Sequence, residues 1–507
     1  MIPGDPVAVL RQDIEQFTAQ MLEGYEREAV SERKIIRDAV LGTHSYAPWE
    51  IHLIDTPLVQ RLRDIHQTAL AYFTYPSAHH TRFEHTLGVR TVASRLLRGI
   101  RARERSGDIP CPDFTLSDGQ VDNAICACLL HDIGHAFFSH VSEQLYGRDP
   151  ALQALKKDLR IAAKGHELVS YLLVCSGPLR KLIERIGDLY SVHLDPDQIA
   201  ALIVGHAPKK ERFLANIVNS VIDCDKLDYI PRDCYATGLN LGTDLDRVYY
   251  TTCLLNNHGE IILAIDMGGA YTVEQILFNK MLLFSAIYYH HKVRAAECMI
   301  YALCEVWGGE SKKGNVFPLE SPVDFLRASE NTVLDPNGKP KPLADFIRRV
   351  INRRLYQRAG VICQSTVVPS QEYFDFLAQT KNPEMGNAFR TDLLSALRAR
   401  DSRFSSWTLQ DVWLDMPPSP TFDETSNSRV RIPDGLGAYT SKPLSDLFPT
   451  ANWSDAYTQH KLKGHVFCSP SPPDMRSIVC QEARRILEGE GVDITVLPGF
   501  ELEAKIR

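Results

Sequence analysis

The sequence predicts a mainly α-helical protein with a mixed α+β region toward its C-terminal end. From residue 41 to about 300, apolar residues recur at the spacing of amphipathic helices, as in Phe83, Leu87 and Leu96. Beyond residue 310 the pattern changes to strand-like apolar runs separated by turn residues, such as the Asp-Pro-Asn-Gly turn at 335–338.

The chain is long enough for several structural units around at least one large core. Its 507 residues suggest about two to four units of roughly 100–200 residues each. Near the N-terminus, Ile14 and Phe17 recur with charged residues between them, which predicts a helical segment. We expect an N-terminal helical arm, a helical body and a mixed α+β region, over residues 1–40, 41–305 and 306–507.

Short apolar segments predict a few strands. Residues 260–265 follow a turn at 256–259, which is typical of a hairpin or of an edge strand. In the C-terminal third, residues 464–468 and 493–497 are strand candidates on either side of an amphipathic helix around residues 475–489.

Composition and charge are those of an ordinary globular protein. Hydrophobic residues make up 44% and charged residues 23% of the chain, and the net charge is −7. An acidic chain is not built as a polyanion-binding surface, so local basic groups would have to hold any nucleotide or nucleic acid. This argues against a dedicated DNA-binding protein, leaves nucleic acid open as a partner, and is compatible with a nucleotide enzyme.

The cysteines and the apolar runs indicate where the protein works. The 12 cysteines are scattered without a CxxC pair, which favours reduced thiols over a disulfide framework. The N-terminus lacks the basic start and apolar core of a secretory signal, and no apolar run reaches the ~18–20 residues of a membrane span. We therefore expect a cytoplasmic protein that does not bind a membrane.

A His-Asp pair ends one of the most apolar helical segments. His131 and Asp132 follow a run that would be buried, and burial of a carboxylate and an imidazole costs several kcal/mol unless a partner compensates. A divalent cation is one such partner, because imidazole nitrogen suits Zn, Fe or Mn and carboxylate oxygen also suits Mg. A helix cap or a satisfied core pair explains the two residues equally well when they are considered alone.

Four segments together hold an unusual share of the histidine and aspartate, at residues 79–85, 131–140, 165–167 and 223–229. Adjacent helix residues point ~100° apart, so His131 and Asp132 can reach one ion only if it lies beside the helix end. Other helices must then supply the remaining ligands. His85 and Asp225 are the candidates.

The order of these residues resembles a known family. His85, then His131-Asp132, then Asp225 is similar to the H…HD…D metal signature of the HD superfamily, which implies an HD-domain helical core. Flanking motifs resemble the deoxynucleoside triphosphate (dNTP) triphosphohydrolase branch, over residues 54–63, 80–89, 131–140 and 225–233. The similarity covers about residues 36–297 and thins beyond 310 to fragments such as 353–358.

The resemblance implies roles for the histidines and acids of these motifs. His135 would contact phosphate or a second, Mg-like ion, and His166 would be a further active-site histidine. His140 lies three residues before Glu143, so on a helix the carboxylate can orient and charge the imidazole, as in the family's acid/base dyad. The alternatives are that His140 and Glu143 form an ordinary surface pair and that His166 is a solvated residue at the start of a helix. The implied metal ligands are His85, His131, Asp132 and Asp225.

The resemblance also implies a substrate site. Lys226 would bind the polyphosphate, and Lys280 stands where relatives usually carry an arginine for the outer phosphates. Arg82 would meet the α-phosphate or the base. A salt-bridged helix face would account for Lys226 and Asp233 equally well. Around the sugar, Tyr229 would pack beneath the ring, and Asp233 and Gln67 would bond the 3′-hydroxyl.

Two positions depart from the family's pattern. Pro231 lies between Tyr229 and Asp233, removes a helical hydrogen bond and is expected to kink the helix. Thr68 stands where an apolar residue that packs on the base is common. Both departures concern base preference and exact substrate, and neither touches the metal ligands.

The resemblance implies metal-dependent hydrolysis of a dNTP to a deoxynucleoside and triphosphate. The metal, Fe, Zn or Mn with a possible second Mg, would activate water, and His140, made cationic by Glu143, would protonate the departing 5′-oxygen. Relatives imply a homo-oligomer and a nucleotide effector. The alternatives are an HD hydrolase of a dNMP, cyclic nucleotide or alarmone, and a nucleotide- or nucleic-acid-binding subunit without turnover.

Overall fold

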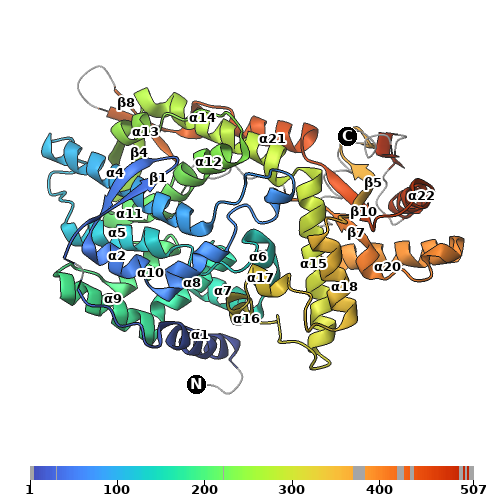
Figure 1. The fold of residues 1–507 in the computed structure, drawn as a ribbon. Helices are drawn as coiled ribbons and strands as arrows, with labels where there is room; N and C mark the ends of the chain where they lie inside the picture. Colours follow the sequence, from blue (N-terminus) through green and yellow to red (C-terminus); the bar gives the residue numbers. More distant parts are fainter. Residues whose placement is uncertain are drawn as a thin grey trace.

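A computed structural model describes residues 5–29, 31–220, 222–368, 383–418, 428–433, 439–489, 495–496 and 499–501. The described chain is mainly helical, with a helical body and a smaller α+β part formed by the C-terminal third (Figure 1). The predicted fold class is therefore confirmed. No helix in these residues combines the length and apolarity that a bilayer span requires.

The N-terminal segment is half helix and half hairpin. Helix α1 (Pro6–Leu22) begins at Asp5, whose side chain accepts from the Val7 amide, and its buried Ile14 and Phe17 join the main core. The helix expected to continue to residue 40 is wrong, because β1 (Lys34–Asp38) pairs antiparallel with β2 (Gly42–Tyr46).

The turn of this hairpin explains the error. Gly42 has φ +86°, and the Asp38 carboxylate accepts from the amides of Val40 and Leu41. These local contacts close a tight turn between two strands, and such a turn cannot lie within a continuous helix. α1 packs on α9 (Gly177–Tyr190) and α7 (Pro150–Leu159), so it belongs to the body and does not stand off as an arm.

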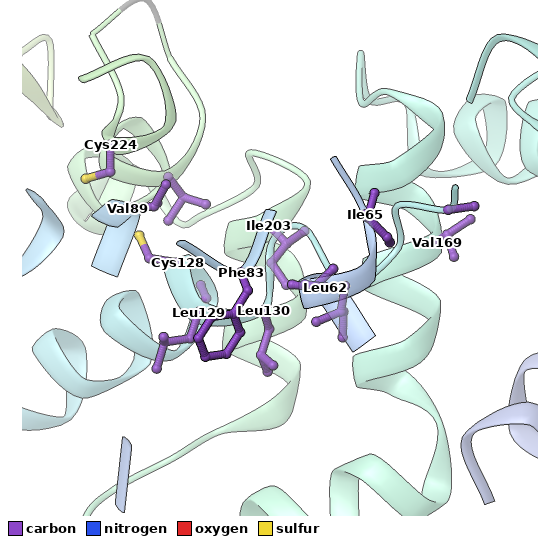
Figure 2. Close-up of a cluster of buried hydrophobic side chains, with 14 of the residues drawn as sticks. Leu62, Ile65, Phe83, Val89, Cys128, Leu129, Leu130, Val169, Ile203 and Cys224 are labelled. Atoms are coloured by element: carbon purple, nitrogen blue, oxygen red, sulfur yellow. The ribbon is translucent and has the colours of Figure 1, made fainter. Parts of the chain in front are cut away.

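The helical body is built around α4 (Arg82–Arg105) and α5 (Asp118–Leu130), which pack against each other. Figure 2 shows their buried side chains, with the sulfur atoms of Cys128 and Cys224 in the same apolar cluster. All cysteines are free thiols, as predicted. The surrounding helices are α2 (Pro48–Ile54), α3 (Pro57–Gln60), α6 (His140–Tyr146), α8 (Gly165–Cys175), α10 (Pro196–Ile203), α11 (Arg212–Val218), α12 (Cys224–Thr237), α13 (Leu245–Thr251), α14 (Met267–Leu283) and α15 (His291–Ser311).

A four-stranded sheet of order β3-β4-β8-β9 covers one end of the body. The predicted hairpin is confirmed, because β4 (Glu260–Asp266) pairs antiparallel with β3 (Thr252–Asn257). β4 is not an edge strand, since it also pairs in parallel with β8 (Arg429–Pro433), which β9 (Tyr439–Pro443) follows. In Figure 1, β8 (orange) therefore lies beside β4 and α13 (green), which come from the middle of the chain.

The C-terminal third contributes to both parts of the molecule. Helices α16 (Pro322–Arg327), α17 (Glu330–Val333) and α18 (Lys341–Ile351) contribute buried residues to the main core. The boundary expected at residue 305 falls inside α15, which packs along α18. A second core begins at Ala359.

This second core lies around an antiparallel sheet of order β5-β10-β7. Its strands are β5 (Gln357–Ile362), β10 (Gly464–Cys468) and β7 (Val412–Asp415), and helices α20 (Pro383–Arg400) and α22 (Pro473–Gly489) pack on them. β10 and α22 confirm two late predictions. Of the strand predicted over 493–497, the described residues Thr495–Val496 form β11, paired with β6 (Val367–Val368), and the others lie outside the described residues. Helix α21 (Thr450–His460) precedes β10.

Buried charges fix the returning strand β8 to the body. The Arg431 guanidinium donates to both oxygens of Asp108, at 2.5 and 2.9 Å, and to Asp266 at 2.6 Å. Arg103 on α4 pairs with the same two carboxylates. The pKa of Asp108 is lowered, chiefly by its hydrogen bond to Arg431, so the pair is ionised at neutral pH.

We expect Arg431→Gln to lower the melting temperature by a few degrees, because it removes one of the two guanidinium groups that Asp108 and Asp266 share, at a cost of about 1–3 kcal/mol. Arg348→Gln is the control, since its partner Asp345 is half exposed and such pairs contribute less than about 1 kcal/mol. Thermal unfolding followed by circular dichroism compares the two. Equal melting temperatures would contradict the assigned role of Arg431.

Candidate active site

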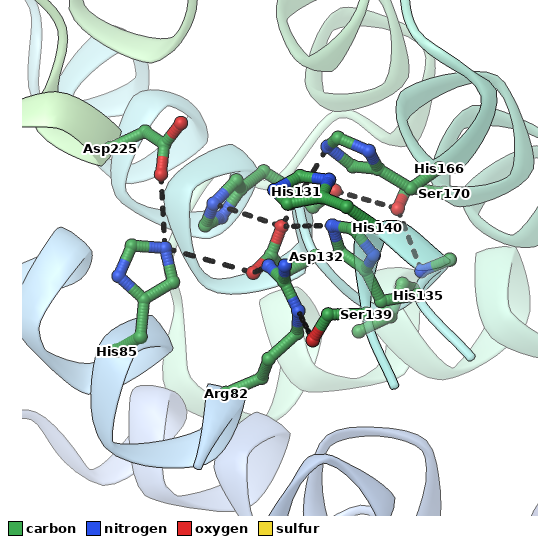
Figure 3. A network of polar contacts seen from close by, with 12 residues as sticks. Arg82, His85, His131, Asp132, His135, Ser139, His140, His166, Ser170 and Asp225 are labelled. Atoms are coloured by element: carbon green, nitrogen blue, oxygen red, sulfur yellow. Dashed lines mark hydrogen bonds and ion pairs between the residues drawn. The ribbon is translucent and has the colours of Figure 1, made fainter. Parts of the chain in front are cut away.

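The structure brings the four histidine- and aspartate-rich segments together (Figure 3). His85 projects from the first turns of α4, and His131-Asp132 follow the end of α5. His166 lies in the first turn of α8, and Asp225 in the first turn of α12. Helix ends converge here because each carries polar residues beside an otherwise apolar body.

The carboxylate of Asp132 lies at the centre of this arrangement. It is 1% exposed, and Arg82 Nη1 donates to its Oδ2 at 2.6 Å. Asp225 Oδ1 lies 3.0 Å from Nε2 of His85. Four imidazole nitrogens lie 3.3–3.9 Å from one oxygen or the other of Asp132, those of His85, His131, His135 and His166.

Two of the imidazoles turn Nε2 toward this centre. His85 Nδ1 hydrogen-bonds Asp228 Oδ2 at 2.8 Å, and His131 Nδ1 hydrogen-bonds the Cys128 carbonyl at 2.8 Å. Because each Nδ1–H donates to its acceptor, each Nε2 faces inward and is the atom that would bind a cation after losing any proton it carries. Both Nε2 atoms are buried; that of His131 has no hydrogen-bond partner among the described residues, and that of His85 faces the Asp225 carboxylate at 3.0 Å.

Such atoms fit a divalent cation. Ligand atoms of His85, His131 and Asp225 lie within 4.8 Å of one another, and atoms around one ion at ~2.1 Å are expected about 3.0–3.5 Å apart. Although burial lowers it, hydrogen bonds to Asp225 and Asp228 raise the pKa of His85 to about 10. That shift reflects an excess of buried negative charge, which a cation would neutralise.

A second histidine group lies beside the first. Glu143 accepts from His140 Nδ1 through Oε2 and from His166 Nδ1 through Oε1, both at 2.8 Å. His135 stacks on His166 with ring centroids 3.8 Å apart. These four residues also have ligand atoms within 4.8 Å of one another, so the group could hold a second ion or a phosphate.

The surroundings act differently on the two imidazoles that share Glu143. Desolvation by surrounding atoms lowers the pKa of His140, and the hydrogen bond and charge of Glu143 offset this only in part, although the His140 side chain is 60% exposed. Arg82 and His166 also act against charge on His140. Desolvation also opposes charge on His166, but Glu143 outweighs it and raises the pKa of His166.

The backbone before His140 is held in an unusual conformation. Phe138 and Ser139 have φ of +53° and +51°, which is costly for residues with a side chain. Glu330, from the C-terminal third, accepts from the Phe138 amide at 3.1 Å. Ser139 Oγ donates to the His66 carbonyl at 2.5 Å and accepts from Arg82 Nε at 2.9 Å. These contacts stabilise the turn that presents His140.

Two glycines of the motifs are required by close packing. A Cβ at Gly88 would lie 1.8 Å from Oδ1 of Asp228, the carboxylate that orients His85. A Cβ at Gly134 would lie 2.2 Å from the His166 carbonyl. Gly134 therefore allows the turn after α5 to lie close against α8, and it does not have the positive φ of a helix C-cap.

The expected substrate residues surround the centre in different states. Lys226 Nζ donates to Asp223 at 2.7 Å and to the Ser220 carbonyl at 2.6 Å, which agrees with the alternative of a salt-bridged face. Gln67 Oε1 and Arg82 Nη2 are buried without a partner among the described residues.

Asp233 is engaged by the protein. His80 Nε2 lies 2.7 Å from one of its oxygens, and Tyr288 donates to the other at 2.5 Å. Half-buried Tyr229 lies one turn earlier on α12, which continues through Pro231 to Thr237. Lys280 lies near the end of α14, which packs against α12.

Several residues that position the site were given no role from the sequence. Asp228 stood in a quoted motif, and its spacing from Asp225 offered a signal. His80, Tyr288 and Glu330 come from segments whose proximity only the fold reveals. The geometry as a whole offers a buried cation-binding donor set, acid/base histidines and unpaired polar atoms, which suits hydrolysis of a phosphoester.

Comparisons with known proteins agree with this geometry. Residues 82–232 match the HD domain family, and residues 244–435 match the HD associated region. The chain is 27% identical to an uncharacterized protein of Methanocaldococcus jannaschii, over 82% of this chain and 75% of the relative. It is also 27% identical to the deoxynucleoside triphosphate triphosphohydrolase SAMHD1 of Gallus gallus, over 68% of this chain and 59% of that protein.

A solved structure has the same fold. The crystal structure of a phosphohydrolase from Bacteroides thetaiotaomicron superposes with a TM-score of 0.62, at 20% identity, and covers 87% of this chain and 100% of that chain. The HD match includes His85, His131, Asp132 and Asp225, the residues that converge in the structure. The chain therefore belongs to the HD-domain family, with an HD domain followed by the HD associated region.

Proposed function

We propose that the protein is a metal-dependent dNTP triphosphohydrolase that releases a deoxynucleoside and triphosphate. The observation that carries this proposal is the buried donor set around Asp132, with the His140–Glu143–His166 group beside it. Relatives named deoxynucleoside triphosphate triphosphohydrolases support the choice of substrate. When bound, a divalent cation supplies Lewis-acid chemistry and water activation, and the mixed imidazole–carboxylate set suits Fe, Zn or Mn, with a second, Mg-like ion at His135.

The chain's own residues would bind and orient the triphosphate. The unpaired Nη2 of Arg82 is a donor for an α-phosphate oxygen, and Arg82 is already fixed by Asp132 and Ser139. Lys226 and Lys280 would offset charge on the outer phosphates. Electrostatic stabilisation of this kind depends on groups that do not reorganise during the reaction.

The sugar would lie against α12. Asp233, held by His80 and Tyr288, can accept the single O–H of a 3′-hydroxyl, and the side-chain amide nitrogen of Gln67 can donate to the same oxygen. Tyr229 would pack beneath the ring. A carboxylate fixed by two neighbours presents a rigid acceptor, which favours discrimination between sugars.

His140 would donate a proton to the departing 5′-oxygen. Glu143 accepts from its Nδ1–H, so Nε2 is the atom that faces the substrate. A lowered pKa makes the imidazolium a stronger acid, although a smaller fraction is protonated at neutral pH. Homo-oligomerisation and control by a nucleotide effector are further proposals, which rest on the family resemblance.

The proposal is tested by the products. Metal-loaded protein incubated with each dNTP should release a deoxynucleoside and triphosphate, resolved by ion-exchange chromatography, and chelation or Asp132→Ala should abolish release. Release of orthophosphate or pyrophosphate would identify a different hydrolase. Tight dNTP binding without turnover under any divalent metal would instead indicate a binding subunit.

Asp228→Asn should weaken metal affinity about 10–100-fold, because the carboxylate that orients His85 is lost. Metal content after dialysis against buffered metal concentrations measures the effect. Asp188→Asn, at an exposed position of α9, is the matched control. Unchanged affinity in the Asp228 variant, with an unchanged melting temperature, would disprove this role.

His140→Gln should reduce kcat roughly 10²–10⁴-fold and leave metal content unchanged, because a general acid is removed while the donor set around Asp132 stays intact. His193→Gln, on an exposed loop, is the control. Steady-state kinetics together with metal analysis separate the two effects. A loss of metal in the His140 variant would show that it supports the metal centre and not proton transfer.

A further inference from the structure

A hollow of about 640 Å³ lies beside the metal centre and has no part in the mechanism above. It is bounded by the loop that leads into α8, by α11, and by strands β4 and β8. None of the residues around Asp132 lines it. Its volume is in the range of sites for nucleotide-sized molecules, which is about 300–1,000 Å³.

One side of β4 forms a wall of this hollow. The described part of β8 pairs with β4 from Ala264 onward, so no described strand pairs with Ile262 and Leu263 on the side opposite β3. Asn216 of α11 caps one backbone group there, since its Oδ1 accepts from the Leu263 amide at 3.3 Å. One wall of the hollow is therefore the edge of β4, and side chains of α11 and of the loop before α8 line the rest of it.

Basic groups outnumber acidic ones on the lining. The lining has two carboxylates, and each has a partner: Glu260 lies 3.7 Å from Arg212, and Glu167 accepts from the Lys164 amide at the start of α8. No carboxylate of the described residues pairs with Arg160 or with Arg429, which line the hollow from opposite segments. The surplus charge is positive in a protein whose net charge is −7.

The remaining lining is partly apolar and partly amide. Ile161, Ile222 and Ile262 offer apolar surface, and Asn219 and Asn257 offer hydrogen-bonding groups. A ligand with an anionic end and a planar, polar body satisfies all three kinds of surface. We propose that this hollow is a second anion site, which binds a polyphosphate group carried by a nucleoside triphosphate or released as free triphosphate.

The location links such a ligand to the metal centre. Lys164 and Glu167 line the hollow, and His166 between them belongs to the centre. Ser220 also lines it, and its carbonyl accepts from Lys226, next to Asp225. A bound anion therefore contacts the two segments that position His166 and Asp225.

Binding to metal-stripped, full-length protein tests the site without turnover. Titration calorimetry with inorganic triphosphate should detect binding that Arg160→Glu/Arg429→Glu weakens at least about tenfold, since two charge-assisted contacts become repulsive. Arg105→Glu, an exposed arginine at the end of α4, should change it less than about twofold. Arg160→Gln/Arg429→Gln replaces the charge reversal if that variant has a lowered melting temperature.

The outcomes are separable. The proposal is overturned if the unaltered protein does not bind triphosphate. It is also overturned if the double variant binds triphosphate as tightly as the unaltered protein, because the anion then binds at the metal centre. If the double variant also loses affinity for dATP, and the unaltered protein binds dATP more tightly than triphosphate, the ligand is a nucleoside triphosphate. Equal affinities identify free triphosphate. Because no hydrolysis is measured, failure of the dNTPase proposal and failure of this site are distinct results.

Discussion

The buried carboxylate of Asp132 is the constraint on which the rest of the site depends. An isolated negative charge at the end of an apolar helix would cost several kcal/mol, so its surroundings must compensate. The protein supplies Arg82 and four imidazoles from three segments of the chain. Because Asp225 and Asp228 also lie close by, negative charge remains in excess at this site. This excess makes the site suited to a cation.

Remote parts of the chain hold this arrangement in place. Asp228 orients His85 and is itself held by Arg232, which also reaches Asp38 in the N-terminal hairpin at 2.8 Å. Glu330 fixes the strained turn before His140 from the other side. The hairpin and the C-terminal helices therefore act as supports for the site, because hydrogen-bond partners for buried polar groups hold those groups in one arrangement.

The two histidine groups have different electrostatic surroundings, and this suits them to different tasks. His85 and His131 each bond through Nδ1 to an acceptor and turn Nε2 inward, as metal-binding imidazoles do. His140 and His166 share Glu143, but the pKa of His140 is lowered and that of His166 is raised. His166 bonds the Glu143 carboxylate through both its backbone amide and its Nδ1. One glutamate, Glu143, thereby orients two imidazoles whose pKa values shift in opposite directions.

The sequence by itself determined the helical class, the apolar helices α4 and α5, the late strand β10 and the residues that gather around Asp132, because spacing and residue chemistry are local properties. It could not show the hairpin at 34–46, the pairing of β8 with β4, the bonds of Asp233 to His80 and Tyr288, or the lowered pKa of His140. Those depend on contacts between residues far apart in the chain, and only the tertiary structure decides which distant groups desolvate, pair with or orient one another.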